Sequence, residues 1–147
     1  MASDSEHLFG LPHRPPFIFV RELTSVVAGS SAECSTFFDA ADPMLAGHFP
    51  GNPLVPGVIL TEALAQTAGI AAASGYPEEA RPLFLLSAIR AMKFPRAVRP
   101  GEPIQLHAEK MAHVGDLLQF SVRATVEGAP VAEGQLVLSI ARAEGAK

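Results

Sequence analysis

The sequence predicts an α+β domain in which a curved antiparallel sheet wraps around one long central helix. Helix-forming residues run without interruption from Val58 to Ser74, and nearly all of them are apolar. A helix that is apolar on every face must be surrounded by other elements. Segments rich in β-formers flank it, two before and four after, and such runs of strands with one helix are typical of α+β proteins.

The other elements follow from proline, glycine and β-former patterns along the chain. Leu11 to Pro16 (LPHRPP) is too proline-rich for a helix or a central strand and should form a loop. Residues 39–56 hold four prolines and predict a long ordered loop, a kind of segment that is usually functional. Pro56 can begin the helix and Gly75 can end it. The expected strands are 17–27, 31–38, 83–94, 104–113, 117–126 and 131–141, with turns at 29–30, 115–116 and 127–128.

Length and composition bound the class of protein. The 147 residues predict a single domain over 11–142, between a mobile tail at 1–10 and a second tail at 143–147. The chain is 48% hydrophobic with a mean hydropathy of +0.25, which suggests a buried subunit interface. The net charge of −4 argues against non-specific nucleic-acid binding.

Cysteine usage and the distribution of apolar residues bound the compartment. Cys34 is the only cysteine, so an intrachain disulfide is excluded, and the first residues lack the pattern of a signal peptide. The apolar run from Val58 to Ala73 is too short for a membrane span and contains Glu62 and Gln66. We therefore expect a cytoplasmic protein.

Two titratable residues stand out in the most apolar part of the chain. Glu62 is the only formally charged residue from Pro43 to Pro77, and His48 is the only other residue there that titrates near neutrality. Burial should raise the pKa of Glu62, and Gln66, four residues later, shares its helix face. Glu62 could instead be a satisfied core carboxylate, and His48 a loop residue that binds a carbonyl. We favour a functional pair.

A histidine and a carboxylate that face one cavity can act as base and acid. The backbone N–H groups of Gly57 and Val58, at the start of the helix, could hold a carbonyl oxygen that becomes anionic. These parts suit proton abstraction next to a carbonyl, and the apolar helix could line a slot for a hydrophobic chain.

Four motifs carry a resemblance to a known family. They are LPHR…PF near the start, GHFPGNPLVPGVILTEALAQ in the middle, KF…PGE at 93–102 and EG…VAEG at 127–134. In this order they resemble the β-hydroxyacyl-acyl-carrier-protein dehydratases of the FabZ group, over about residues 11–142. The resemblance implies a hot-dog fold and a lyase that removes water from (3R)-3-hydroxyacyl-acyl-carrier-protein to give the trans-2-enoyl product.

The same resemblance implies a role for each matching residue. His48 would take the α-proton, and Glu62 would give its proton to the leaving hydroxyl. The Gly57 N–H would bind the thioester carbonyl, Gln66 would support Glu62, and the Val55 carbonyl would orient His48. Glutamate at position 62 favours dehydration alone, since the related dehydratase-isomerases typically have aspartate there.

The resemblance also implies how the protein assembles and what it binds. It would form a homodimer whose sites combine a histidine and a glutamate from different subunits, with a trimer of dimers possible. It would need no cofactor beyond the phosphopantetheine of the acyl carrier protein, and we see no metal-ligand spacing. Arg90, Lys93, Arg96 and Arg99 could form a patch for the acidic carrier, or simply a solvated strand end.

Departures from the family pattern leave the pathway open. Pro15, Met44-Leu45 and Arg90 replace residues usual in the family, so chain-length preference is not fixed and a secondary-metabolite dehydratase fits as well. The alternatives are a hot-dog thioesterase, a coenzyme A hydratase, whose Asp-x-Asn-x-x-His pattern we do not find, and a non-catalytic acyl-carrier-binding subunit. His13, in the LPHR loop, is expected to be structural.

Overall fold

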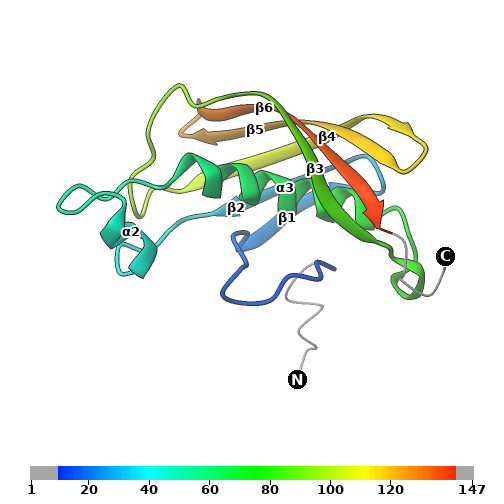
Figure 1. Cartoon of the computed structure of the whole chain (residues 1–147), viewed down its shortest axis with the longest axis horizontal. Helices are drawn as coiled ribbons and strands as arrows, with labels where there is room; N and C mark the ends of the chain where they lie inside the picture. Colours follow the sequence, from blue (N-terminus) through cyan, green and yellow to red (C-terminus); the bar gives the residue numbers. More distant parts are fainter. Residues whose placement is uncertain (1–9, 142–147) are drawn as a thin grey trace.

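The computed structural model describes residues 10–141, so the expected tails, apart from Gly10, lie outside the described residues. Six antiparallel strands form one curved sheet in the order β1-β2-β4-β5-β6-β3, and helix α3 lies along its concave side (Figure 1). The elements are β1 (Glu22–Val27), β2 (Ser31–Thr36), α2 (Pro43–Gly47), α3 (Gly57–Ala73), the 3-10 helix η1 (Glu78–Ala80), β3 (Leu83–Lys93), β4 (Ile104–Val114), β5 (Leu117–Val126) and β6 (Ala129–Ala141).

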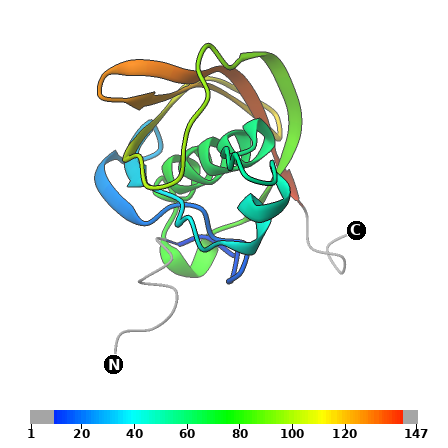
Figure 2. The same ribbon diagram turned by 90° about the vertical axis from the view of Figure 1, so that its left-hand side faces the viewer.

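The sheet encloses α3, as the sequence predicts. Seen end-on, the helix is surrounded by strands and by the segments that precede it (Figure 2). Leu64 and Ala68 of the helix belong to the same buried core as Leu106, Phe120 and Leu136 of the sheet, all at most 1% exposed. Each large apolar side chain buried in this way contributes about 1.5–3 kcal/mol. This is the hot-dog arrangement that the resemblance implies.

The hairpins that extend the sheet follow the expected turn signals. Glu127 and Gly128 both adopt positive φ, 50° and 80°, which is the geometry of a two-residue turn between β5 and β6. Along β5 the buried residues alternate, as its apolar pattern predicts. The register places Arg123 beside Glu133 across this hairpin.

The first expected strand is too long at its start. Pairing begins at Arg21, whose N–H donates to the Ser35 carbonyl, and β1 begins only at Glu22. Residues 17–19 lie outside the sheet because the side chain of Gln66 takes their backbone groups: the Phe17 carbonyl accepts from Nε2 and the Phe19 N–H donates to Oε1. A long-range contact with α3 therefore replaces the strand.

The segment 39–56, expected to be all loop, contains the short helix α2. Asp42 caps it, since its Oδ1 accepts from the Met44 N–H at 3.0 Å, and Pro43 occupies the first turn. The Asp-Pro pair was the sequence signal for this helix. α2 buries Leu45 completely and ends at His48, which fixes the histidine at the start of the following turn.

Candidate active site

Helix α3 supplies one of the two predicted residues. Glu62 is its only charged side chain, and 19% of that side chain is exposed. Gln66 Nε2 donates to Glu62 Oε2 at 3.3 Å, so the two residues share a helix face as their spacing predicts. Burial raises the pKa of Glu62, and the hydrogen bond from Gln66 opposes that rise. The carboxyl group is therefore suited to hold a proton.

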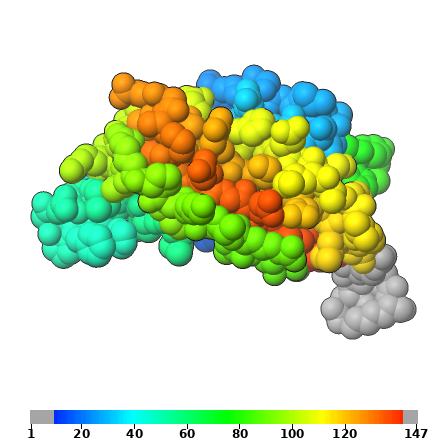
Figure 3. Space-filling model, turned by 90° about the horizontal axis from the view of Figure 1, so that it is seen from above, coloured from blue at the N-terminus to red at the C-terminus, as the bar shows by residue number. Residues whose placement is uncertain are grey.

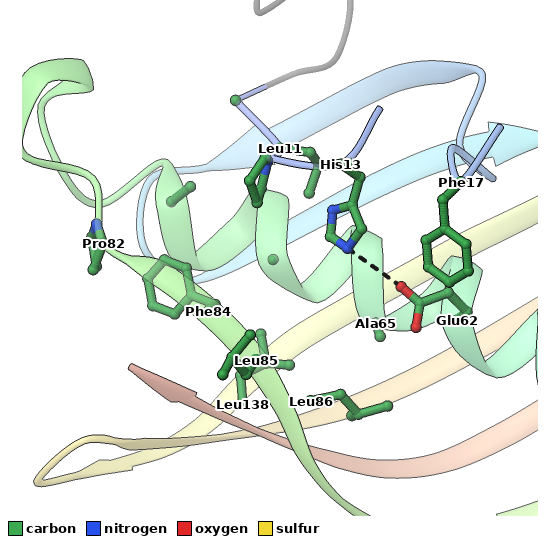
Figure 4. Close-up of a pocket in the computed structure, with 14 residues that line it drawn as sticks. Leu11, His13, Phe17, Glu62, Ala65, Pro82, Phe84, Leu85, Leu86 and Leu138 are labelled. Atoms are coloured by element: carbon green, nitrogen blue, oxygen red, sulfur yellow. Dashed lines mark ion pairs between the residues drawn. The ribbon is translucent and has the colours of Figure 1, made fainter. Parts of the chain in front are cut away.

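Glu62 opens into an apolar cavity of about 160 Å³. The helix contributes small residues to its wall at 65, 69 and 73, and β3 contributes Phe84, Leu85 and Leu86 (Figure 4). Within this wall Glu62 and His13 are the only titratable side chains. A narrow apolar cavity that ends at one carboxyl group suits an aliphatic chain with one reactive position.

His48 lies in a second cavity, of about 300 Å³, at the start of α3. The turn after α2 closes through Leu54, whose N–H donates to the His48 carbonyl at 2.7 Å and whose carbonyl lies 3.1 Å from His48 Nδ1. A carbonyl only accepts, so in the neutral ring Nδ1 carries the hydrogen and Nε2 presents a free lone pair. That arrangement suits a base.

The carbonyl that orients His48 is not the one that the resemblance implies. It belongs to Leu54 and not to Val55. Val55 is held elsewhere, because its N–H donates to the Val98 carbonyl at 2.8 Å, and its contribution is to line the His48 cavity.

Gly57 lies beside the same cavity at the first turn of α3. The first intrahelical donors are Ile59 and Leu60, which both bond to the Pro56 carbonyl, so the Gly57 and Val58 N–H groups have no acceptor among the described residues. These amides, at the positive end of the helix dipole, could hold an oxyanion. The Phe94 ring packs so closely on Gly57 that a Cβ there would lie 3.2 Å from it.

One protomer does not bring His48 and Glu62 into one cavity. His48 shares its cavity with Val55 and Gly57, whereas Glu62 shares the other with His13. Glu62 lies five positions after Gly57, about 7.5 Å further along the axis of α3. A site that uses both residues needs more than the described protomer.

His13 is the site residue that the sequence reasoning missed. Its Nε2 lies 3.6 Å from Glu62 Oε2 (Figure 4). The LPHR motif marked the loop, but a contact across 49 residues of sequence has no local signal. His13 was expected to be structural, and the structure places it beside the carboxyl group.

Acidic residues lie next to part of the predicted basic patch. Arg90, Lys93, Arg96 and Arg99 are all exposed, and Arg96 lines the His48 cavity. The fold, however, brings acidic residues close to three of these four. Glu102 binds two of them: its Oε2 lies 2.7 Å from Arg96 Nη2, and its Oε1 accepts a hydrogen bond from the Arg99 N–H. Lys93 is next to Glu133 in the sheet. The backbone N–H of Arg99, more than the nearby cations, lowers the pKa of Glu102.

We also searched the described residues for metal-binding groups and membrane-spanning helices. Residues 10–141 contain no group of three or more metal-binding side chains placed to hold an ion. No described helix is long and apolar enough to span a membrane.

The chain is similar in sequence to known dehydratases. A family model for ApeI-like dehydratases matches residues 24–135. The 3-hydroxyacyl-[acyl-carrier-protein] dehydratase FabZ of Chloroflexus aggregans is 36% identical over 140 residues, which is 95% of this chain and 96% of that protein. FabZ of Myxococcus xanthus is 37% identical and covers 88% of this chain and 86% of its own length.

Solved structures confirm the fold. The dehydratase heterocomplex ApeI:P of Xenorhabdus doucetiae superposes with a TM-score of 0.76 at 18% identity, over 90% of this chain and 89% of that one. A hypothetical thioesterase from Streptococcus pneumoniae, solved with coenzyme A, gives a TM-score of 0.65 at 12% identity, over 82% and 84% of the two chains. At these identities the likeness shows the hot-dog fold and nothing further.

Proposed function

The chain belongs to the 3-hydroxyacyl-[acyl-carrier-protein] dehydratases, and on this premise we propose that it removes water from a carrier-bound 3-hydroxyacyl chain, with His48 as base and Glu62 as acid. The observation that carries the proposal is Glu62 itself. It is the only charge on a buried helix, burial favours its protonated form, and an apolar cavity opens beside it. A protonated carboxyl group in that place can give its proton to a leaving hydroxyl.

The reaction balances with two proton transfers. His48 Nε2 takes the proton from the carbon next to the thioester carbonyl, and that electron pair forms the new double bond. The carbon–oxygen bond breaks on the other side, and Glu62 gives its proton to the hydroxyl, which leaves as water. The Gly57 and Val58 N–H groups stabilise the charge on the carbonyl oxygen. His48 ends with the added proton and Glu62 without one, so a proton must return before the next turnover.

We propose that each site forms between two copies of the chain, in a homodimer. The separate cavities of His48 and Glu62 support this arrangement. So does β3, which lies at the edge of the sheet and pairs on one side only among the described residues. Figure 3 shows it as a green band along the border of the molecule, beside β6. Its exposed apolar residues are Leu83, Leu85, Leu86 and Ile89.

A long apolar edge strand is a surface that folded proteins normally cover. Pairing β3 with β3 of a second copy would bury it and bring further exposed apolar residues, such as Val58 and Phe94, toward the partner. A trimer of such dimers is the larger assembly that the family suggests.

The acyl carrier protein is the proposed partner, and its phosphopantetheine is the only prosthetic group that the reaction uses. Arg96 of the basic patch lines the His48 cavity, which supports docking of an acidic carrier near it. We further propose a cytosolic location, which the single buried cysteine, Cys34, suits because it forms no disulfide.

Subunit mixing tests the site directly. His48→Ala and Glu62→Gln should each lower dehydration of 3-hydroxyacyl-carrier substrates by about 10²–10⁴-fold. When the two inactive variants are co-expressed with different tags, half of the random dimers carry one intact site out of two. About one quarter of the wild-type activity should therefore return.

The products decide between functions. Mass spectrometry should detect the 2-enoyl thioester as the product. In the reverse direction it should detect the 3-hydroxyacyl thioester formed when water adds to the 2-enoyl thioester. Release of free acid would point to a thioesterase, and tight carrier binding without any product would point to a binding subunit. If the mixed variants stay inactive although heterodimers form, each site lies within one chain and the interface proposal is wrong.

A further inference from the structure

The two oxygens of Glu62 have different surroundings, and His13 is one reason. We propose that His13 is a positioning residue: its Nε2 and that of Gln66 together hold Glu62 Oε2, which leaves Oε1 as the oxygen that transfers the proton. The assignment of Oε1 to proton transfer depends on the proposed dehydratase function; the contacts to Oε2 do not.

Gln66 is fixed by three hydrogen bonds. Its Oε1 accepts from the Phe19 N–H at 2.9 Å, and its Nε2 donates to the Phe17 carbonyl at 3.0 Å and to Glu62 Oε2 at 3.3 Å. A flipped amide would face the Phe17 carbonyl with an oxygen, so only this orientation satisfies both backbone groups. Gln66 is 1% exposed and therefore offers Glu62 a rigid N–H donor.

The loop that carries His13 is held in place from both sides. Leu11 is buried at 4% exposure, and the Arg14 guanidinium donates to the carbonyls of Leu11 and His13 at 3.0 and 2.7 Å. The His13 ring stacks on Phe17 with 5.9 Å between centroids. Its Nε2 lies 3.6 Å from Glu62 Oε2, within ion-pair range. Such contacts in ligand-free enzymes are often long and tighten when substrate binds.

The buried Nδ1 of His13 decides which nitrogen carries the hydrogen. It has no hydrogen-bond partner among the described residues. A buried N–H without an acceptor is disfavoured more than a buried lone pair without a donor. The neutral ring therefore carries its hydrogen on Nε2, which faces Oε2 from 3.6 Å and becomes a second donor when the contact shortens. Burial lowers the pKa of His13, which favours this neutral form.

Few other charges among residues 10–141 can act on Glu62. α3 carries no second charge, and the segment of β3 at the cavity is apolar. Arg14 is engaged with its own loop, while Glu78 and Arg81 line a neighbouring pocket and not the cavity of Glu62. In the proposed dimer, His48 of a second copy would join these groups of the described residues.

Oε1 is thus the oxygen without an N–H donor among the described residues, and in Figure 4 it points away from His13. Donors on Oε2 disfavour a hydrogen there, so the acidic hydrogen resides on Oε1. His13 and Gln66 would then aim that hydrogen at the substrate hydroxyl.

Two replacements of similar length separate the N–H donor from packing. His13→Gln keeps a donor near the position of Nε2, whereas His13→Met fills the same space without one. Both lose the stacking on Phe17. The pKa of Glu62 can be read by NMR in protein with ¹³C-labelled glutamate carboxyls, because its resonance is the one missing from Glu62→Gln.

An N–H donor stabilises the carboxylate, so removing it should raise the pKa of Glu62. We expect His13→Met to titrate about one pH unit above His13→Gln, which should stay near wild type. The turnover number for dehydration should fall about tenfold in His13→Met and be largely kept in His13→Gln. Equal Glu62 titrations in the two variants would overturn the proposal. The titration decides this even if wild type shows no dehydration, a result that would contradict only the proposed function.

Discussion

Arg96, which lines the His48 cavity, places its Nη2 2.7 Å from Glu102 Oε2. The sequence from 81 to 101 contains no acid, so the patch looked uniformly basic; the turn before β4 brings Glu102 back onto it. Arg96 is therefore held by an acid. Among residues 10–141 the side chains of Arg90, Lys93 and Arg99 form no ion pair. Lys93, however, is next to Glu133 in the sheet and the Arg99 N–H binds Glu102, whereas Arg90 is opposite the uncharged Gln135. This contrast decides which cation to test for carrier docking.

Arg90→Glu should raise the KM for carrier-bound substrate several-fold and leave the KM for the matching acyl-pantetheine unchanged. Reversing an exposed charge weakens the attraction of an acidic partner but does not alter the distant chemistry. The two KM values should be compared at low and high salt, since screening should reduce the effect. Arg123→Glu, an exposed reversal on β5, is the matched control. Equal effects of both variants would mean that overall charge, and not the patch, attracts the carrier.

Gln66→Leu should destabilise the protein by roughly 2–5 kcal/mol, because it leaves the Phe17 carbonyl and the Phe19 N–H without their partner. Urea unfolding measures the loss. Gln119→Leu removes a side-chain pair with Gln135 at 2.9 Å on the sheet and should change the free energy of unfolding by less than about 1 kcal/mol. A similar loss in both variants would show that Gln66 does not anchor the first segment.

The contacts of Gln66 also explain why one part of the fold could not be predicted from the sequence. Local patterns were sufficient for α3, for the strands after it and for the turn at Glu127-Gly128, since periodicity and turn chemistry are local. They failed at Phe17, where β-formers predict a strand and a side chain from α3 takes the backbone groups instead. Propensity describes what a segment prefers alone, and here a buried tertiary contact outweighs it.

In the candidate active site, too, local patterns predicted some features and tertiary contacts determined others. Glu62 and Gln66 were paired correctly because a four-residue spacing fixes their geometry on a helix. The contact of His13 with Glu62 and the choice of the Leu54 carbonyl over Val55 depend on how loops close, for which no periodic signal exists. Likewise Asp42-Pro43 was read as loop, although it combines a helix cap with a first-turn proline.

Glu62→Gln should stabilise the protein relative to wild type, and the difference should grow with pH. The pKa of Glu62 is raised from 4.5 in the folded chain, so the folded chain binds this proton more tightly than the unfolded chain does. The stability that this proton linkage adds is complete below the unfolded value and is lost as pH rises through the raised folded value. Glutamine does not titrate, so it avoids that loss.

Urea unfolding of both proteins between about pH 5 and about pH 8 measures this difference. Glu79→Gln, an exposed change on η1, should show no such trend. A difference between Glu62→Gln and wild type that stays constant over this range would mean that the carboxyl group is not protonated by burial.

Ile89→Lys should convert the protein to a monomer and abolish dehydration together. Ile89 is 53% exposed on the edge strand β3, where a second copy would bury it, and a buried unpaired lysine is strongly unfavourable. Light scattering after size exclusion gives the mass. Val114→Lys, at a residue 74% exposed on the β4–β5 hairpin, should leave mass and activity unchanged. An active monomer of Ile89→Lys would contradict a shared site.

Gly57→Ala should lower the turnover number without unfolding the protein. Alanine suits the first turn of a helix, but its Cβ would lie 3.2 Å from the Phe94 ring, so this ring, which lines the His48 cavity, must shift. A displacement of a few tenths of an ångström beside the oxyanion donors should reduce turnover about tenfold. Steady-state kinetics and a thermal melt measured together separate this effect from loss of fold.

Phe94→Leu in the Gly57→Ala background tests whether the clash with Phe94 causes the loss of turnover. The smaller side chain removes the clash, so turnover should recover toward that of Phe94→Leu alone, and the two changes should be non-additive. Strictly additive losses would mean that Gly57 acts through backbone freedom and not through space for Phe94. In that case the N–H groups at the start of α3 would depend on glycine itself, and Gly57→Ala would remain impaired whatever occupies position 94.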